Sequence, residues 1–255
     1  MRCSRRSRGA DVRATVLALL IGCSESQPQP QPPAQAPAGS ESTPARVIAD
    51  AAVPDAAPPI PIVDTPMKWS KKREALTLSY RRQHSDRDVE NLTIEPKVIV
   101  LHYTAGGSGA ATRAYMDNLE IEASRPELRK AGLVNVSSHF VIERDGTIYR
   151  IQPETRFARH CIGLNHLAIG IENVGDDKKW PLTDAQVSAN VALIRDLTAR
   201  FPITHLLGHF EAMKFKKHAY YVELDPNYGN DKPDPGAAFM QKVRAKVGEL
   251  KLQGL

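Results

Sequence analysis

Cysteine is scarce in this chain of 255 residues, and aromatic residues make up only 6% of it. Two of the three cysteines, Cys3 and Cys23, lie close to the N-terminus, which leaves Cys161 alone in the part with a globular composition. A single cysteine cannot form an intrachain disulfide, so a disulfide framework is excluded there. This does not argue against export, because a domain of this size can stabilise itself without cross-links.

The chain also lacks a broad excess of positive charge, although its formal net charge is +5. Residues 1–22 contain five arginines and one aspartate, so the remainder of the chain is nearly neutral. A nucleic-acid-binding domain needs a basic field on its folded part. We therefore expect no nucleic-acid partner.

A long apolar run is absent near the N-terminus as well. The apolar stretch from Ala14 to Gly22 is too short to span a bilayer as a mature helix, and it follows an arginine-rich start. This arrangement is typical of a signal peptide. The stretch ends in LIGC at residues 20–23, which resembles the lipobox of bacterial lipoproteins, in which the cysteine receives the lipid. We expect residues 1–22 to be a lipoprotein signal peptide and Cys23 to be lipidated; the alternative is a plain secretory signal cut near Gly22.

The residue after the expected lipidated cysteine is Ser24 and not an aspartate. In lipoproteins of double-membraned bacteria this implies sorting to the outer membrane, so the resemblance implies a protein anchored there by its lipid and facing the periplasm. Residues 23–66 are rich in Pro, Ala and Gln and have few large apolar groups. Such a segment cannot bury enough surface to order itself, and its prolines favour an extended spacer. We expect a disordered linker at 23–66 and a folded domain at 67–255.

The folded part alternates between strand and helix patterns. Apolar runs predict strands at 97–103, 137–143, 147–152 and 168–172. Helices are predicted at 110–120, at 184–200 and from about 235 to 247. Asp145-Gly146 indicates a hairpin between the second and third strands, and Thr183 with Gln186 forms a capping box before the long helix. Together these elements predict a single α/β domain with a mixed central β-sheet flanked by helices.

Three side chains in this pattern have the chemistry of a metal site. His102 follows the apolar run VIVL and His209 follows HLLG, so both should lie at strand ends, where clefts form. Asp234 stands between two prolines that fix its backbone. Two histidines and one carboxylate make a hydrolytic zinc triad with a fourth position left for water. Taken singly, each residue has another explanation: the histidines as core residues, and Asp234 as the cap of the last helix with Pro235 at its first position.

Residues 95–245 resemble the type 2 N-acetylmuramoyl-L-alanine amidases, which share a fold with the peptidoglycan recognition proteins. The segments that carry this resemblance occur in the following order: HYTA (102–105), SSHFVIERDGTIYR (137–150), RHCIG (159–163), AIGIENVG (168–175), LLGHFE (206–211) and KPDPGAAF (232–239). Each coincides with a predicted strand end or loop, which makes the combination specific.

The resemblance implies that His102, His209 and Asp234 bind Zn²⁺ and that Glu172 is the catalytic base. A carboxylate beside zinc-bound water can remove its proton and later deliver it to the leaving amine. Lys232 would stabilise the oxyanion. Judged as single residues, Glu172 and Lys232 can also be solvated side chains. The implied reaction is hydrolysis of the amide between muramic acid and L-alanine in peptidoglycan, by a protein that we expect to be a monomer.

Three further residues are expected to contact the substrate: Thr104, Ser138 and His160. The family's histidine at position 160 usually follows a tryptophan, whereas Arg159 precedes it here. Ser138 occupies the position where some zinc amidases have a tyrosine, so Glu172 would carry the acid–base role alone. His139 is expected to pack in the core.

The segment between the second and third expected ligands is longer than in many members of the family. Residues 210–231 are rich in aromatic residues and lysines and can form a flap over the cleft. The segment also contains two alternative ligands, Asp225 and His218. Asp234 is preferred over both because it completes the K-x-D-P-G segment.

Other classes of function are less well supported. A non-catalytic peptidoglycan-binding module is the main alternative, because members of the wider fold can lose a zinc ligand; the intact set of residues favours an enzyme. A cysteine amidase using Cys161 is disfavoured, because no nucleophile motif surrounds it and the adjacent His160 is expected to point away along a strand. Residues 106–109 lack the Lys-Ser/Thr ending of a phosphate-binding loop.

Overall fold

The computed structural model describes residues 60–254, so the expected signal peptide, Cys23 and most of the expected linker lie outside the described residues. The strands are β1 (Ile62–Asp64), β2 (Val98–Tyr103), β3 (Phe140–Ile142), β4 (Ile148–Arg150), β5 (Ala168–Asn173) and β6 (His205–Gly208). The helices are α1 (Lys71–His84), α2 (Gly109–Asp117), α3 (Pro126–Lys130), α4 (Asp184–Arg200) and α5 (Ala237–Lys246), with short 3₁₀ helices η1 (His209–Lys217) and η2 (Gly248–Leu250). Within 60–254, no helix has the length and apolar character needed to cross a membrane.

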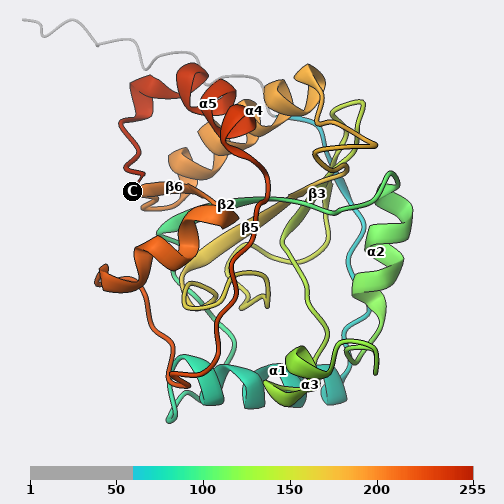
Figure 1. The fold of residues 1–255 in the computed structure, drawn as a ribbon, viewed down its shortest axis with the longest axis vertical. Coiled ribbons are helices and arrows are strands. Elements are labelled where there is room, and N and C mark those ends of the chain that lie inside the picture. Colours follow the sequence, from blue (N-terminus) through green and yellow to red (C-terminus); the bar gives the residue numbers. More distant parts are fainter. Residues whose placement is uncertain (1–59, 255) are drawn as a thin grey trace, which may run out of the picture. The chain divides into compact units, whose positions relative to one another are not determined.

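The strands form one mixed sheet in the order β1-β4-β3-β5-β2-β6 (Figure 1). Only β3 and β4 pair in the antiparallel sense, through the hairpin predicted at Asp145-Gly146, and the other neighbours are parallel. The prediction of an α/β domain with a mixed central sheet flanked by helices is therefore confirmed.

The two faces of the sheet have different partners because side chains alternate along each strand. One face, which includes Ile99 and Leu101 of β2, packs against α4 and α5 and forms the larger core. The opposite face includes Val98 and Val100, and it is covered by residues 161–167 and by η1. His102 and Glu172 continue this second pattern, and they are register partners at the ends of β2 and β5. Both side chains therefore leave the sheet on the face away from α4 and α5.

Helix α4 begins and ends where the sequence predicted. The Thr183 side chain accepts a hydrogen bond from the Gln186 backbone N–H, and the Gln186 side chain accepts one from the Thr183 N–H, which completes the capping box. Helix α5 begins at Ala237, with Gly236 as its N-cap. Asp234 is therefore not the cap of this helix, which removes the structural alternative for that residue.

Strand β1 and helix α1 were not predicted, nor were the short helices α3, η1 and η2. Strand β1 lies within the stretch assigned to the linker, yet it pairs with β4, so the sheet includes residues that precede the expected boundary at 67. Helix α1 was missed because its buried positions carry polar side chains, among them Arg73, Thr77 and His84, and so it shows no apolar stripe. Ser70 caps it by accepting a hydrogen bond from the Arg73 backbone N–H.

Candidate metal centre and cavity

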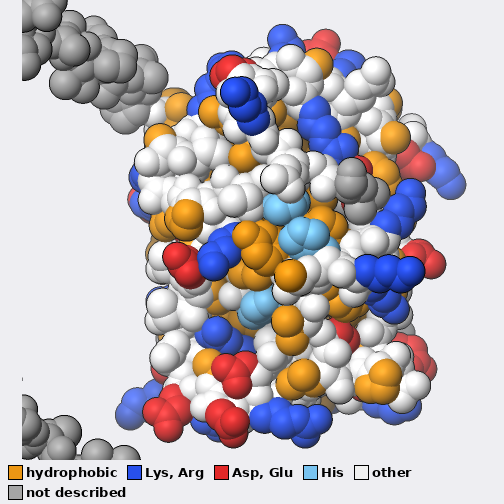
Figure 2. All heavy atoms as spheres, turned by 90° about the vertical axis from the view of Figure 1, so that its left-hand side faces the viewer, with side chains coloured by type: hydrophobic (Ala, Val, Ile, Leu, Met, Phe, Trp, Pro, Cys, Tyr) orange, Lys and Arg blue, Asp and Glu red, His pale blue; other side chains and the backbone are white. Residues whose placement is uncertain are grey.

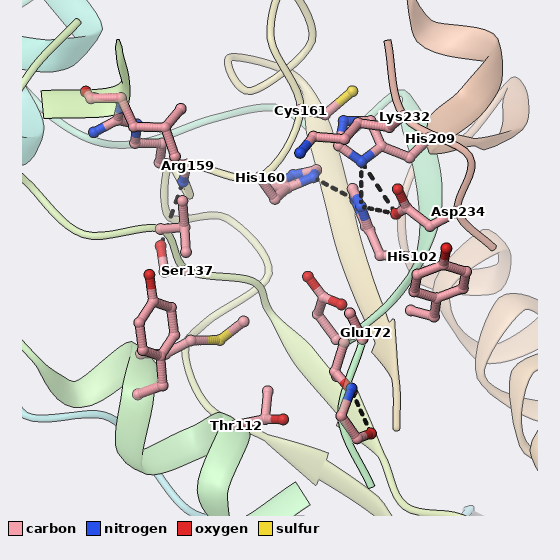
Figure 3. Close-up of a pocket in the computed structure, with 18 of the residues that line it drawn as sticks. His102, Thr112, Ser137, Arg159, His160, Cys161, Glu172, His209, Lys232 and Asp234 are labelled. Atoms are coloured by element: carbon pink, nitrogen blue, oxygen red, sulfur yellow. Dashed lines mark hydrogen bonds and ion pairs between the residues drawn. The ribbon is translucent and has the colours of Figure 1, made fainter. Parts of the chain in front are cut away.

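A cavity of about 660 Å³ opens on the face of the sheet opposite α4 and α5. Figure 3 shows that its walls come from strand ends and from loops distant in sequence. Figure 2 shows histidine side chains near the middle of one face of the molecule, with hydrophobic and basic side chains around them. Residues that line the cavity include His102, Arg159, His160, Glu172, Lys232 and Asp234.

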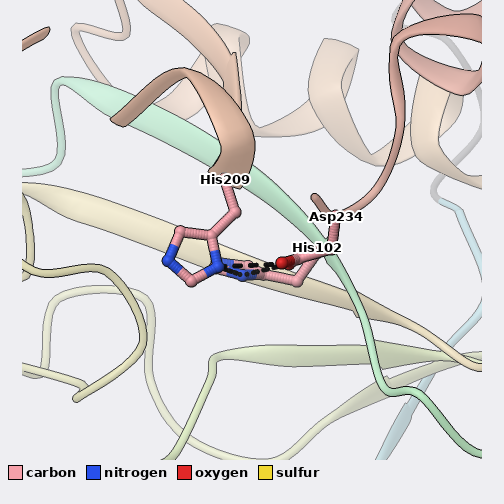
Figure 4. A group of neighbouring side chains, drawn as sticks. All are labelled: His102, His209 and Asp234. Carbon is pink, nitrogen blue, oxygen red and sulfur yellow. Dashed lines mark hydrogen bonds and ion pairs between the residues drawn. The ribbon is translucent and has the colours of Figure 1, made fainter. Parts of the chain in front are cut away.

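Three of the predicted ligands converge on one point (Figure 4). The Nδ1 atoms of His102 and His209 are 3.0 Å apart, and each lies 3.1 Å from Oδ2 of Asp234. Tetrahedral zinc, with bonds of about 2.0–2.1 Å, holds neighbouring ligand atoms about 3.3 Å apart. The spacing and the donor set of two imidazole nitrogens and one carboxylate oxygen therefore fit a zinc ion.

Backbone pairing brings these ligands together. Strand β2 pairs with β6, and the partner of Leu101 is Gly208, so the residues that follow them, His102 and His209, lie side by side. The Phe210 backbone N–H donates to the Asp234 carbonyl oxygen at 2.9 Å. This hydrogen bond connects the segment of Asp234 to the residue that follows His209.

Hydrogen bonds of buried polar side chains connect these segments to α4 and α5. The Glu211 carboxylate accepts a hydrogen bond from the Gly208 N–H at 2.8 Å and also pairs with Arg244 of α5. On the neighbouring strand, the Asn173 amide donates to the His102 carbonyl oxygen at 3.1 Å and accepts from Asn190 of α4 at 2.6 Å. The ligands are thus fixed to both helices of the opposite face.

The charge states of the ligands suit metal binding. Burial, together with neighbouring His209, lowers the pKa of His102 to about 4, which keeps its imidazole neutral at pH 7. Burial alone would raise the pKa of Asp234, but its hydrogen bonds with His102 and His209 hold that pKa well below its ordinary value. Neutral imidazoles and an ionised carboxylate are the forms that coordinate a metal.

Glu172 lies beside this cluster with its carboxyl group directed into the cavity (Figure 3). Its Oε2 is buried and has no hydrogen-bond partner among residues 60–254. Burial and the charge of Asp234 raise its pKa well above the ordinary value, and Lys232 opposes that effect. A carboxyl group with a raised pKa in a cleft is suited to taking up and releasing a proton.

The other predicted site residues have different outcomes. Thr104 and His160 line the cavity, as does Lys232. The expectation for Ser138 is wrong: its side chain is fully buried and donates to the Phe140 carbonyl oxygen at 3.0 Å. Its neighbour Ser137 lines the cavity instead.

His139 lies in the core, and His160 lies beside the ligand cluster. His139 is fully buried, contacts the Arg156 carbonyl oxygen through Nε2 at 2.8 Å and accepts from the Gly170 N–H at 3.0 Å, so its expected place in the core is confirmed. His160 was expected to point away along a strand. It lies in a turn before β5 instead, and its ring faces His102.

The alternative ligands and the alternative nucleophile lie elsewhere or are inert. The His218 ring stacks on Phe215, and the Asp225 carboxylate accepts from the Asn227 N–H, so neither joins the cluster. Burial raises the pKa of the Cys161 thiol well above its ordinary value, which leaves the thiol protonated and unreactive.

Sequence reasoning missed one polar wall of the cavity. Arg159 is buried, and its guanidinium donates to the carbonyl oxygens of Gly132, Val134 and Leu128 and to the Tyr228 hydroxyl. No sequence signal marks it, because its partners are backbone atoms of α3 and of the segment that follows it, and a tyrosine 69 residues away.

Known proteins share this fold and sequence pattern. The chain is 33% identical over 99 residues to the endolysin of Escherichia phage T7. The aligned region covers 37% of this chain and 66% of the endolysin. It is 29% identical over 114 residues to peptidoglycan-recognition protein SC2 of Drosophila melanogaster, covering 43% of this chain and 61% of that one. These matches therefore span about two thirds or less of the relatives' length.

A solved structure has the same fold over most of the described chain. The N-acetylmuramoyl-L-alanine amidase LysC from Clostridium intestinale superposes with a TM-score of 0.50 at 22% identity, covering 74% of this chain and 99% of that one. Residues 92–237, more than half of the chain, match the family described as N-acetylmuramoyl-L-alanine amidase. The chain therefore belongs to the N-acetylmuramoyl-L-alanine amidase family.

Proposed function

We propose that this protein is a zinc-dependent amidase that hydrolyses the bond between muramic acid and L-alanine in peptidoglycan. The observation that carries the proposal is the convergence of three candidate ligand atoms beside Glu172, whose buried Oε2 has no hydrogen-bond partner within residues 60–254. The cluster of His102, His209 and Asp234 fits the zinc site of this amidase family. The phage endolysins among its relatives are consistent with action on the cell wall.

The residues of the cavity can divide the reaction between them. Zn²⁺ held by His102, His209 and Asp234 would supply Lewis acidity at this point of the cavity. Glu172 accepts a proton from the attacking water and delivers it to the leaving amine of L-alanine. The ammonium group of Lys232 stabilises negative charge on the carbonyl oxygen. Asn173 keeps His102 in place through its backbone carbonyl.

The test is to measure bound metal and cleavage of purified peptidoglycan in the wild type and in Glu172→Ala. The products to detect are free L-alanine amino groups and muramic-acid carboxyl groups. We expect about one zinc per chain in both proteins and a loss of at least about 10²-fold in turnover in the variant. Wild-type protein that binds peptidoglycan without cutting it would contradict the proposal and identify a recognition module.

We further propose that the enzyme is anchored in the outer membrane through a lipid on Cys23. The supporting feature is the LIGC segment followed by serine, in residues outside the structure's described range. Expression in a double-membraned bacterium should place the wild type in the outer-membrane fraction and Cys23→Ala in the soluble fraction. Wild-type protein found in the soluble fraction would contradict the anchor.

A further inference from the structure

His160 contacts a metal ligand rather than lying free along the groove. Its Nδ1 is 3.1 Å from Nε2 of His102, on the side of that ring opposite the metal site. Its own Nε2 is 3.2 Å from the Ala168 carbonyl oxygen. The two imidazole rings meet edge to face, with centroids 5.2 Å apart (Figure 3). A chain of contacts therefore runs from the ligand through His160 to the backbone at the start of β5.

This chain of contacts determines which nitrogen atoms carry protons. A carbonyl oxygen only accepts hydrogen bonds, so Nε2 of His160 carries the proton and its Nδ1 is an acceptor. That acceptor requires a proton on Nε2 of His102. The Nδ1 lone pair of His102 is then free and faces Asp234 and His209. This is the tautomer that can bind a metal through Nδ1.

The surrounding structure holds the His160 ring in place. The side-chain oxygen of Asn165 accepts from the backbone N–H groups of both His160 and Cys161, at 2.8 and 2.7 Å. Beneath the ring lies Gly170 of β5, where an added Cβ would approach ring atoms to 2.7–2.9 Å. The strand therefore leaves room for the imidazole because residue 170 has no side chain.

We propose that His160 is a positioning residue for the metal: it fixes the tautomer and orientation of His102 and so raises the affinity of the triad for zinc. Loss of a hydrogen bond from a neighbouring residue to a metal ligand typically lowers metal affinity by about 10–100-fold. The proposal rests on metal binding at the triad, as in the proposed function, but not on which bond the enzyme cuts.

The test compares zinc dissociation constants, measured by competition with a chromophoric chelator, for four proteins. His160→Phe keeps a ring but lacks the acceptor, whereas His160→Asn can place an amide oxygen near the former Nδ1. His166→Asn is the matched control, because His166 follows in the same turn, is not a member of the ligand cluster, and has no hydrogen-bond partner at Nδ1 within residues 60–254. We expect about 10–100-fold weaker binding in His160→Phe, most of the affinity restored in His160→Asn, and no change in His166→Asn.

Equal affinity in the wild type and His160→Phe would overturn the proposal, and so would equal losses in the Phe and Asn variants. Wild-type protein without zinc affinity would instead contradict the proposed function. Should His160→Phe fail to fold, long-range ¹H–¹⁵N spectra of the wild-type histidines still decide the question. We expect the His102 proton on Nε2 in the metal-free and zinc-loaded protein; a proton on Nδ1 in the metal-free protein would overturn the proposal.

Discussion

The Glu172 carboxyl group lies where its charged form is costly. Its Oε2 is buried without a partner among residues 60–254, and the Asp234 carboxylate is a nearby like charge. The pKa of Glu172 is therefore raised in the folded protein. A carboxyl group with a raised pKa contributes stability that is complete below its unfolded value of 4.5 and is lost as the pH rises towards the folded value. The group that we propose for proton transfer therefore lowers the stability of the fold at neutral pH.

Replacing Glu172 with Gln should stabilise the metal-free protein at pH 7, because the amide cannot ionise. The gain in melting temperature over the wild type should grow as the pH rises above 4.5 and disappear below it, at about 2–4 °C for each kcal/mol relieved. Thermal unfolding of both chelator-treated proteins from pH 4 to 8 measures this. A difference that is constant with pH, or a less stable variant at pH 7, would contradict the assigned pKa shift.

Lys232 offers a second test among single residues. Replacing it with Met keeps an unbranched side chain that is one atom shorter and removes the charge, so turnover should fall by about 10²–10³-fold if the ammonium group stabilises the oxyanion. The zinc content should stay near that of the wild type, since Lys232 is not a member of the ligand cluster. Loss of zinc together with activity would show that Lys232 holds the ligand loop rather than the transition state.

At the scale of elements, helix α1 packs against residues 218–231, which lie between His209 and Asp234. The His84 ring at the end of α1 contacts Oε1 of Glu223 through Nδ1 at 2.8 Å and the Ala131 carbonyl oxygen through Nε2 at 2.7 Å. Both side chains of the pair are only 5% exposed. The Leu224 N–H also donates to the His84 carbonyl oxygen. Residues 218–231 are therefore held against a helix at the far end of the cavity.

Replacing His84 with Leu should destabilise the protein by about 3–5 kcal/mol, because Glu223 would remain buried without its partner. The same change should expose residues 218–231 to limited proteolysis. Denaturant unfolding and protease digestion measure the two effects. Arg195→Ala is the control, because it removes an ion pair with Glu249 in which both side chains are 52% exposed, and it should change stability little. Equal effects in the two variants would argue against this role of His84.

The elements that sequence could predict share a regular signal. The capping box and apolar stripe of α4 predicted its bounds, and the strand-end positions of His102 and His209 predicted two members of the cluster that can hold a metal ion. Helix α1 escaped because its inner face is built from arginine, threonine and histidine, which satisfy backbone carbonyls rather than forming an apolar core. Ser138 was expected to line the cavity, but its neighbour Ser137 does so. Adjacent side chains of an extended chain point in different directions, so an error of one residue moves the side chain away from the cavity.

At the scale of the whole molecule, the metal site joins segments that are far apart in the chain. His102, His209 and Asp234 come from β2, the start of η1 and the loop before α5. A ligand that binds only the folded state stabilises it by about 2.7 kcal/mol when present at 100 times its dissociation constant. Zinc should therefore act on the stability of the entire sheet and not only on the cavity.

Removal of zinc by a chelator should lower the melting temperature of the wild type by about 5–10 °C relative to protein in excess zinc. In His209→Ala the chelator should have little effect, since one of the three ligands is missing. Differential scanning calorimetry at fixed zinc concentrations gives the comparison. A chelator effect of equal size in both proteins would place the stabilising metal outside the triad.

The hydrogen bond from the Phe210 N–H to the Asp234 carbonyl oxygen closes the intervening chain at its base. The entropic cost of closing a loop rises only slowly with its length, so residues 225–231 can vary in length or sequence while the two ligands remain neighbours and Glu211 and Glu223 keep their buried contacts. The same segment contributes Tyr228 and Asn230 to the cavity wall. Natural variation or grafting within it can therefore exchange this part of the cavity wall while leaving the cluster of His102, His209 and Asp234 intact.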